Sequence, residues 1–267
     1  MMVDDPVEGG WVRHKKVPKP GNYARLEDLL TDLSPSCLEF FEKYRRMYFF
    51  DRFIPDQGME ETLDMLKRYG GQPTRWLDVG ASVTTLFWST AIDTKSTEQI
   101  DLCDIMPEAL FVAKKFKESS EFPRCYEGAL GYLCRNREVV EHTRALPWNY
   151  HVFDCLSTWP NQMRHKSYDL ITAIGILGLS PSADQYKAAF REICGNLTKG
   201  GVFIGVDWVR SDKFVKIDTH DNRYIDTCHI VSLKEKVALK LLSLNSVEIV
   251  GDENYCRLLV WAFLRPN

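Results

Sequence analysis

The chain has 267 residues, of which 45% are hydrophobic and 27% are charged. This composition is that of a folded globular protein and excludes an intrinsically disordered chain. The 34 basic and 37 acidic side chains are interleaved and leave a formal net charge of -3. Nucleic-acid-binding domains usually carry a basic excess or a basic stripe, so no nucleic-acid partner is expected.

The beginning of the chain gives no sign of export or membrane insertion. Residues 1–6 lack the apolar core of a signal peptide, and no apolar run is long enough to span a bilayer. We interpret the basic cluster at 13–19 as a solvated arm. The eight cysteines are scattered without a C-x-x-C pair, so neither a disulfide framework nor a zinc site is expected. These features predict a cytoplasmic protein with no membrane partner and no metal.

In chain order, a short N-terminal segment precedes a single domain. Residues 1–34 are expected to be flexible, and residues 35–267 are expected to form a single domain. From Pro35 onward, apolar and aromatic residues recur at helical spacing. A second helix is expected from Gly58 to Tyr69, where Gly70-Gly71-Gln72-Pro73 ends it. The section 35–70 is therefore expected to be helical.

Strands and helices then alternate. The expected strands cover 75–80, 99–104, 149–153, 168–174, 202–207, 247–250 and 257–264, and the expected helices cover 84–91, a run beginning at Pro107, and 182–197. Residues 198–201 are expected to close the last of these helices, and 121–147 to form a helical insertion. This alternation predicts an α/β fold with a mainly parallel sheet and right-handed crossovers. Ligands of such sheets bind beyond the carboxyl ends of the strands.

The first of these strands ends in the turn Asp78-Val79-Gly80-Ala81-Ser82. Glycine after a strand permits a tight turn and a close approach of a ligand to the backbone. The dinucleotide pattern G-x-G-x-x-G is absent here. A carboxylate at Asp78 suits the positive charge of a sulfonium cofactor better than a pyrophosphate, and Asp104 could accept hydrogen bonds from ribose hydroxyls. Both aspartates could instead be helix N-caps.

Taken together, these residues resemble the class I S-adenosylmethionine-dependent methyltransferases, and more narrowly the group of nicotinamide, phenylethanolamine, indolethylamine and thioether methyltransferases. The resemblance covers roughly residues 40–267. Its motifs are Phe41-Glu42-Lys43-Tyr44, the turn from Leu77 to Thr84, Leu102-Cys103-Asp104-Ile105, Val152-Phe153-Asp154-Cys155 with the insertion before it, Lys199-Gly200-Gly201, and the closing run from Leu259 to Leu264.

The resemblance implies a Rossmann-like fold with a seven-stranded, mostly parallel sheet, an antiparallel last strand, and 35–70 as a helical lid. It also implies S-adenosylmethionine as cofactor, S-adenosylhomocysteine as product, and a small-molecule methyl acceptor. The residues that it assigns to the cofactor are Tyr44, Asp78, Gly80, Ala81, Ser82, Thr84, Asp104, Ile105, Asp154, Cys155 and Ile174. It places Asp207 at the end of the fifth strand, against the substrate, with Ser211 four residues later.

The sequence departs from the family at three places. Ser82 replaces the second glycine of the turn, Ala109 stands where the nicotinamide enzyme has a ribose-contacting asparagine, and Ile176 to Leu179 is apolar where the amine enzymes carry an acidic residue. These departures leave the general activity expected and weaken the choice of substrate.

Methyl transfer from a sulfonium is an in-line displacement, for which the protein supplies alignment and desolvation. We expect Tyr44, Tyr48 and Trp208 to form aromatic walls around a nitrogen nucleophile, with Asp207 and Ser211 orienting it. Core packing is the alternative for these aromatic residues. Methyl transfer to an amine or heteroaromatic nitrogen is the leading prediction for a monomer or weak homo-oligomer. Transfer to sulfur or oxygen, a catalytically silent relative that binds cofactor or a partner protein, and a Rossmann reductase remain open.

Overall fold

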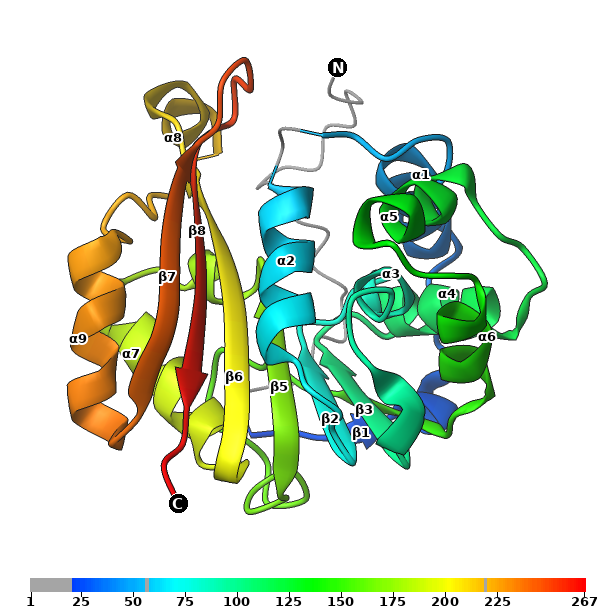
Figure 1. Ribbon diagram of the computed structural model, residues 1–267, viewed down its shortest axis with the longest axis horizontal. Coiled ribbons are helices and arrows are strands. Elements are labelled where there is room, and N and C mark those ends of the chain that lie inside the picture. The colour runs from blue at the N-terminus through cyan, green and yellow to red at the C-terminus, as the bar shows by residue number, and fades with distance from the viewer. Residues whose placement is uncertain (1–20, 56–57, 219) are drawn as a thin grey trace.

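A central eight-stranded sheet with helices on both faces forms the structure, a computed structural model that describes residues 21–55, 58–218 and 220–267 (Figure 1). The strands are β1 Ala24–Arg25, β2 Arg75–Val79, β3 Gln99–Asp104, β4 Trp148–Val152, β5 Tyr168–Ile174, β6 Leu197–Arg210, β7 Lys240–Glu248 and β8 Tyr255–Leu264. The α-helices are α1 Pro35–Phe49, α2 Met59–Tyr69, α3 Thr85–Trp88, α4 Pro107–Glu118, α5 Arg124–Leu133, α6 Glu138–Ala145, α7 Ala183–Cys194, α8 Asp212–Asp218 and α9 Thr227–Val237. Three 3₁₀ turns complete the set: η1 Leu26–Leu29, η2 Thr94–Ser96 and η3 Leu177–Leu179.

The strand order is β1-β4-β3-β2-β5-β6-β8-β7. Strands β4, β3, β2, β5 and β6 are parallel, whereas β8 runs antiparallel to both β6 and β7. The chain moves outward from β2 through β3 to β4 and then returns to β5 on the other side of β2. This reversal places the switch point of the sheet at the carboxyl ends of β2 and β5, where α/β folds bind ligands.

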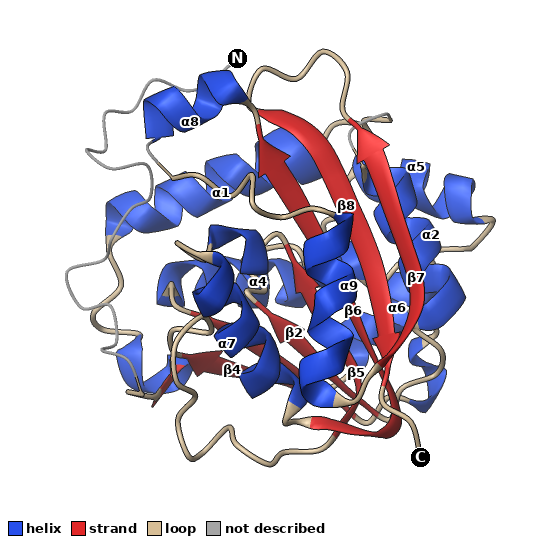
Figure 2. Ribbon diagram, turned by 90° about the vertical axis from the view of Figure 1, so that its left-hand side faces the viewer, coloured by secondary structure: helices blue, strands red, loops and turns tan. Residues whose placement is uncertain are grey.

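The two faces of the sheet bury separate cores. Leu66 of α2, Phe87 of α3 and Leu110 of α4 pack on one face with residues of α5 and α6. Phe190 of α7 and Leu233 of α9 pack on the opposite face. Figure 2 shows α7 and α9 on the side of the sheet that faces the viewer, with α8 and α1 near its upper end. The strands of such a doubly covered sheet are mostly apolar on both sides, as β5 is from Leu170 to Ile174 apart from Thr172.

Local signals fix where several helices begin. Ser34 caps α1 by accepting the Cys37 N–H, with Pro35 in the first helical position. Pro107 likewise stands in the first helical position of α4, as the sequence predicts, but no side chain caps that helix. Acidic residues in the first turn of α2 and basic residues in its last turn complement the helix dipole.

The predicted α/β fold, with a mostly parallel sheet and antiparallel C-terminal strands, is confirmed, and the number of strands is corrected from seven to eight. The additional strand is β1, which pairs antiparallel with β4 inside the segment expected to be flexible. The expectation that 198–201 close the preceding helix is also wrong, because α7 ends at Cys194. These residues belong to β6, where an irregularity in the pairing with β5 and the bond from Gly200 N to Arg265 O accommodate the glycines.

Further expectations concern the insertion, the cysteines, the basic cluster and membrane helices. Residues 121–147 contain α5 and α6, and all eight cysteines are unpaired. The basic cluster at 13–19 lies outside the described residues. Among the described helices, none is both long and apolar enough to cross a membrane.

Candidate functional site

The predicted turn lies at the switch point and is bonded to the end of β3. Gly80 has φ +67°, and the N–H groups of Gly80 and Ala81 both donate to Cys103 O, at 2.8 and 3.1 Å. A Cβ on Gly80 would lie 2.5 Å from the Cβ of Ile176. Glycine is therefore required here both by the backbone conformation and by the close approach of Ile176.

Asp78 is buried beneath this turn and binds two threonines. Thr85 Oγ1 donates to Asp78 Oδ2 and Thr172 Oγ1 donates to Asp78 Oδ1, each at 2.6 Å. Burial raises the pKa of Asp78 to about 6, although the two threonine hydrogen bonds act in the opposite direction. The carboxylate thus holds the turn from below, joining β2 to β5 and to the first residue of α3. A direct contact with a cofactor stays a prediction.

Asp104 ends β3 beside the turn, with its two oxygens directed at backbone amides. Ser82 N donates to Oδ2 and Met106 N donates to Oδ1, both at 2.9 Å. Burial raises the pKa of Asp104, and these N–H bonds partly offset the effect. A carboxylate has about four lone-pair positions, and the backbone N–H of Ile105 also acts on this one, so at least one position is left that could accept a hydroxyl. The side chain remains 9% exposed.

Ser82 occupies the place of the missing glycine in an unusual conformation. Its φ is 46°, in the left-handed region that glycine adopts readily and other residues adopt at a cost of roughly 1–2 kcal/mol. Its N–H is held by Asp104. The serine in place of the glycine expected from the resemblance therefore adds strain at one residue. Thr84 follows as the N-cap residue of α3, with its hydroxyl on Ala81 O.

The neighbouring strand end carries Asp154 and Cys155. Asp154 is half-buried and accepts Leu156 N at 3.0 Å, while Phe153 N donates to Asp104 O and so aligns the two strand ends. The Cys155 thiol points into the core, 3.5 Å from the Cys103 sulfur. Of this pair, Asp154 alone has a side chain at the open edge of the sheet, so the contact expected of Cys155 would have to come from its backbone.

Helix α1 covers this edge, as a lid would. Cys37 and Phe41 of α1 pack with Val83, Met106 and Ala109, and the half-buried Ile105 and Tyr44 border the same cluster. The rings of Tyr44 and Tyr48 lie 4.9 Å apart. Burial raises the pKa of Tyr44, and Tyr48 is 39% exposed. The structure therefore places both predicted tyrosines on α1, with Tyr44 on its inner side.

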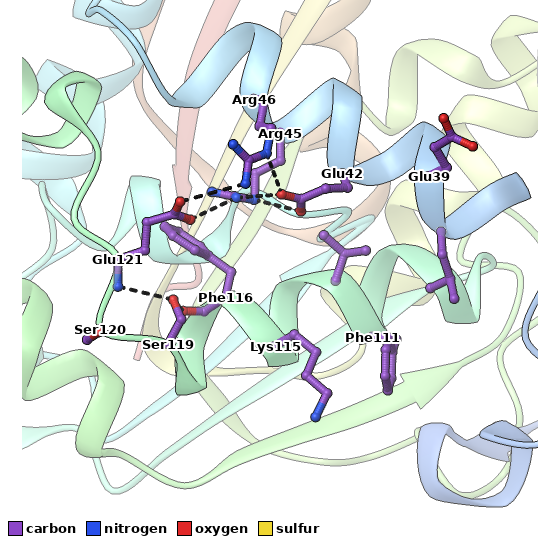
Figure 3. A pocket seen from close by; sticks show the side chains of 12 residues that line it. Glu39, Glu42, Arg45, Arg46, Phe111, Lys115, Phe116, Ser119, Ser120 and Glu121 are labelled. Atoms are coloured by element: carbon purple, nitrogen blue, oxygen red, sulfur yellow. Dashed lines mark hydrogen bonds and ion pairs between the residues drawn. The ribbon is translucent and has the colours of Figure 1, made fainter. Parts of the chain in front are cut away.

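A buried arginine anchors α1 on α4. Arg45 is 3% exposed, and its Nη2 lies 2.7 Å from Glu42 Oε1 and 2.8 Å from Glu121 Oε2. The guanidinium carbon lies 4.3 Å from the centre of the Phe116 ring. Figure 3 shows these groups at one end of an open groove between α1 and α4. At the other end of the helix, Ser34 N donates to Glu108 Oε1 at 2.8 Å, so α1 is fastened to α4 at both ends.

The predicted substrate residues are not brought together. Asp207 does not end its strand, because β6 continues to Arg210, and its side chain is fully buried. Tyr186 Oη and Trp261 Nε1 both donate to Asp207 Oδ2, at 2.7 and 2.9 Å. Burial raises its pKa to about 6. The expected strand-end position of Asp207 is therefore wrong, since the sequence does not show where a long strand stops.

Trp208 and Ser211 have different surroundings. Trp208 lies on the opposite face of β6 from Asp207, because neighbouring residues of a strand alternate. Its ring packs on Gly175, directly after Ile174 at the end of β5. Ser211 Oγ donates to Glu253 O at 2.5 Å and accepts Phe214 N at 3.1 Å. Ser211 thus caps α8 and ties it to the β7–β8 hairpin, so its hydroxyl is already engaged.

Sequence reasoning missed residues that hold the site from behind. Thr172 and Thr85 donate hydrogen bonds to Asp78. Asn222 donates to Trp208 O in β6 and to Gly178 O in the loop after β5. A signal existed for Thr172, since it is a hydroxyl within the apolar run that ends β5 and pairs with Asp78 in register. Asn222 lies in a loop, where asparagine is common and therefore does not indicate a particular role.

The sequence matches no known family model and no curated protein, whereas the fold has many counterparts among solved structures. The N-methyltransferase NodS from Bradyrhizobium japonicum WM9, in complex with S-adenosylhomocysteine, aligns with a TM-score of 0.53 and 16% identity, over 91% of this chain and 97% of that one. Phosphoethanolamine N-methyltransferase 2 of Haemonchus contortus aligns with a TM-score of 0.55 and 15% identity, over 91% of this chain. The [4+2]-cyclase SpnF aligns with a TM-score of 0.55 and 11% identity, over 88% of this chain and 97% of that one.

At these identities the likeness concerns the fold. The chain has the α/β fold of the class I methyltransferases, with the turn at Gly80 on its switch point. It spans 61% of the longer Haemonchus protein. The cyclase in this group shows that the fold also hosts another reaction, so function has to be argued from the site.

Proposed function

We propose that the protein binds S-adenosylmethionine at the turn 78–84 and transfers its methyl group to a small molecule. The observation that carries the proposal is the geometry at Asp104, whose two oxygens hold Ser82 N and Met106 N and keep at least one further lone pair at the edge of the sheet. The bound cofactor would supply an electrophilic methyl group on a sulfonium. The residues of the chain then bind, orient and exclude water.

The described residues would share these tasks by position. Asp104 and Ile105 would hold the adenosine sugar and ring, with Asp154 near the adenine, and the backbone of 80–84 would approach the methionine moiety. Tyr44 and the apolar side of α1 would exclude water from above. Asp78 would act through Thr85 and Thr172, by fixing the turn.

The acceptor proposed first is an amine or heteroaromatic nitrogen, within the nicotinamide and amine methyltransferase group that the sequence resembles. It is supported by the aromatic pair Tyr44 and Tyr48 on the lid, because aromatic faces stabilise a cation that forms on the nucleophile. Transfer to sulfur or oxygen needs the same cofactor site. A cytoplasmic monomer or weak homo-oligomer fits a small-molecule enzyme.

A catalytically silent relative is the second candidate. It is favoured by the strained Ser82 and by Ile176, whose side chain packs against Gly80 where the amine enzymes carry an acidic residue. Such a protein would bind S-adenosylhomocysteine and methylate no acceptor.

Titration calorimetry with S-adenosylhomocysteine tests the cofactor site. We expect the wild type to bind and Asp104→Asn to bind about tenfold or more weakly, because an amide cannot accept on both sides. Asp169→Asn is the matched control. Asp169 also holds two backbone amides, those of Thr74 and Arg75 at 3.0 Å each, but at the opposite end of the sheet.

Unchanged binding by Asp104→Asn, or equal losses in both variants, would contradict the assignment of Asp104. No binding by the wild type would exclude the proposed activity itself. A methyl-transfer assay on a panel of amines, thioethers and phenols then separates the acceptor classes, and binding without turnover across the panel would favour the silent relative.

A further inference from the structure

The loop between β5 and α7, residues 175–180, forms one wall of the candidate site. Its Ile176 side chain is the group that a Cβ on Gly80 would strike. Its Gly175 has φ +79° and lies under the ring of Trp208, where a Cβ would be 3.4 Å from Cζ3. Any shift of this loop therefore moves the side chain that packs on the cofactor turn.

The carbonyl of Gly178 fastens this loop to the segment that follows α8. Asn222 Nδ2 donates to Gly178 O at 3.1 Å, and His220 Nε2 donates to the same oxygen at 3.0 Å. Two side chains from one segment therefore hold a single carbonyl of the neighbouring loop.

The amide of Asn222 also holds the end of β6. Its Nδ2 donates to Trp208 O at 2.9 Å, and its Oδ1 accepts Arg210 N at 2.9 Å. The side chain is 2% exposed. A buried amide whose donors and acceptor are all satisfied has one favourable orientation, so it sets the spacing between β6 and the loop.

The contact between Gly178 and Asn222 is tightly packed. A Cβ on Gly178 would lie 3.3 Å from both Asn222 Nδ2 and Asp207 Oδ1. Helix α8 is fixed to β6, because the buried Arg210 of that strand pairs with Asp218 of α8. Arg210 also donates to His220 O at 2.9 Å. The segment 220–222, α8 and the loop 175–180 thus pack as one unit.

We propose that Asn222 is a positioning residue. It couples the segment 220–226, which follows α8, to the cofactor turn through Gly178 and Ile176. This inference rests on the proposed function, because it makes the order of the segment 220–226 depend on a ligand bound at Gly80. Coupling of this kind is reciprocal. Ligand binding at the turn orders the segment 220–226, and loosening that segment weakens binding at the turn.

Asn222→Asp in the full chain tests the coupling. The carboxylate keeps the shape of the amide, removes both donors and sets an oxygen against two carbonyl oxygens. We expect the dissociation constant for S-adenosylhomocysteine to rise about tenfold. Asn196→Asp is the matched control: Asn196 is also 2% exposed and donates to Glu192 O, but it precedes β6 at the far end of the sheet. The control should bind as the wild type does.

Hydrogen exchange gives a second readout, which a merely structural loss would not produce. In the wild type, S-adenosylhomocysteine should slow exchange at 78–84, 175–180 and 220–226. In Asn222→Asp the slowing should remain at 78–84 and disappear at 220–226. Gly178→Ala presses on the same amide from the loop side and should behave like Asn222→Asp, and it replaces that variant in the test if Asn222→Asp does not fold.

Exchange without ligand separates the coupling from the proposed function. A folded Asn222→Asp protein should exchange faster than the wild type at 175–180, and unchanged exchange there would overturn the coupling. Failure of the wild type to bind S-adenosylhomocysteine would overturn the proposed function, and the ligand-free comparison would still decide whether Asn222 holds the loop. Weaker binding by Asn196→Asp to the same degree would reduce the effect to general destabilisation and overturn the proposal.

Discussion

Two buried carboxylates, Asp78 and Asp207, have the same local physics at the scale of single residues. Each accepts two side-chain hydrogen bonds on a strand of the sheet, and burial raises the pKa of each to about 6, well above the usual 3.8. In the folded protein both groups bind protons more tightly than in the unfolded chain. Each therefore favours folding while it is protonated and loses this contribution as the pH rises through about 6.

Asp207→Asn isolates this effect at one site. A shift from 3.8 to about 6 corresponds to about 3 kcal/mol, so the wild type should gain stability relative to the variant as the pH falls from 7 to about 4. At pH 7 the variant should be at least as stable as the wild type, because asparagine can still accept from Tyr186 and Trp261. Urea unfolding at several pH values measures the difference. A variant with the same pH dependence as the wild type would contradict the assignment.

Ser82→Gly tests the strained residue of the turn. Removing a left-handed non-glycine residue should gain roughly 1–2 kcal/mol, and the added freedom of glycine in the unfolded chain should take back roughly 0.5–1 kcal/mol. We expect a net gain of up to about 1.5 kcal/mol, together with tighter binding of S-adenosylhomocysteine. Cys134→Gly is the control, since Cys134 has a similar φ of 53° at the end of α5. It should gain stability with no change in binding, and equal binding by Ser82→Gly and the wild type would leave Ser82 without a role at the site.

At the scale of elements, the sequence predicted best where periodicity was strong. Helix α1 begins at Pro35 and strands β3 and β5 have the expected bounds, because capping signals and apolar runs mark their ends. Strand β6 was predicted too short, because Gly200 and Gly201 usually end structure and here lie at an irregularity within the strand. Helices α8 and α9 were missed. The first is seven residues long and buries no apolar residue, so it carries no apolar stripe.

The fastening of α1 on α4 leads to a prediction about the stability of this contact. Arg45→Met should destabilise the protein by about 2 kcal/mol, since it removes a buried cation held by Glu42 and Glu121 and leaves both carboxylates without it. Limited proteolysis should cut α1 faster in this variant, and S-adenosylhomocysteine should slow the cut. Lys43→Ala is the control on the same helix, because the Lys43–Glu39 pair is exposed and such pairs contribute little. Equal proteolysis of the two variants would exclude Arg45 as an anchor.

At the scale of the whole molecule, the site depends on strands brought together by topology. The sequence predicted that the ends of β2, β3 and β4 would meet, because parallel strands share one edge, and Gly80, Asp104 and Asp154 do lie there. It failed for Asp207 and Ser211, whose positions depend on the length of β6 and on the capping of α8. Asn222 could not be found from sequence, since its role comes from three backbone groups on two other segments.

Ligand binding at this edge should stabilise the whole chain, because the strands on both sides of the switch point belong to one sheet. A ligand present at 100 times its dissociation constant adds about 2.7 kcal/mol, and each kcal/mol raises Tm by roughly 2–4 °C in a chain of about this size. S-adenosylhomocysteine should therefore raise Tm by about 5–10 °C at that excess. NADH should leave it unchanged, since the turn carries one glycine of the dinucleotide pattern and Asp78 beneath it. Thermal scans with each ligand at matched concentrations measure this, and a rise with NADH alone would replace the methyltransferase assignment with that of a reductase.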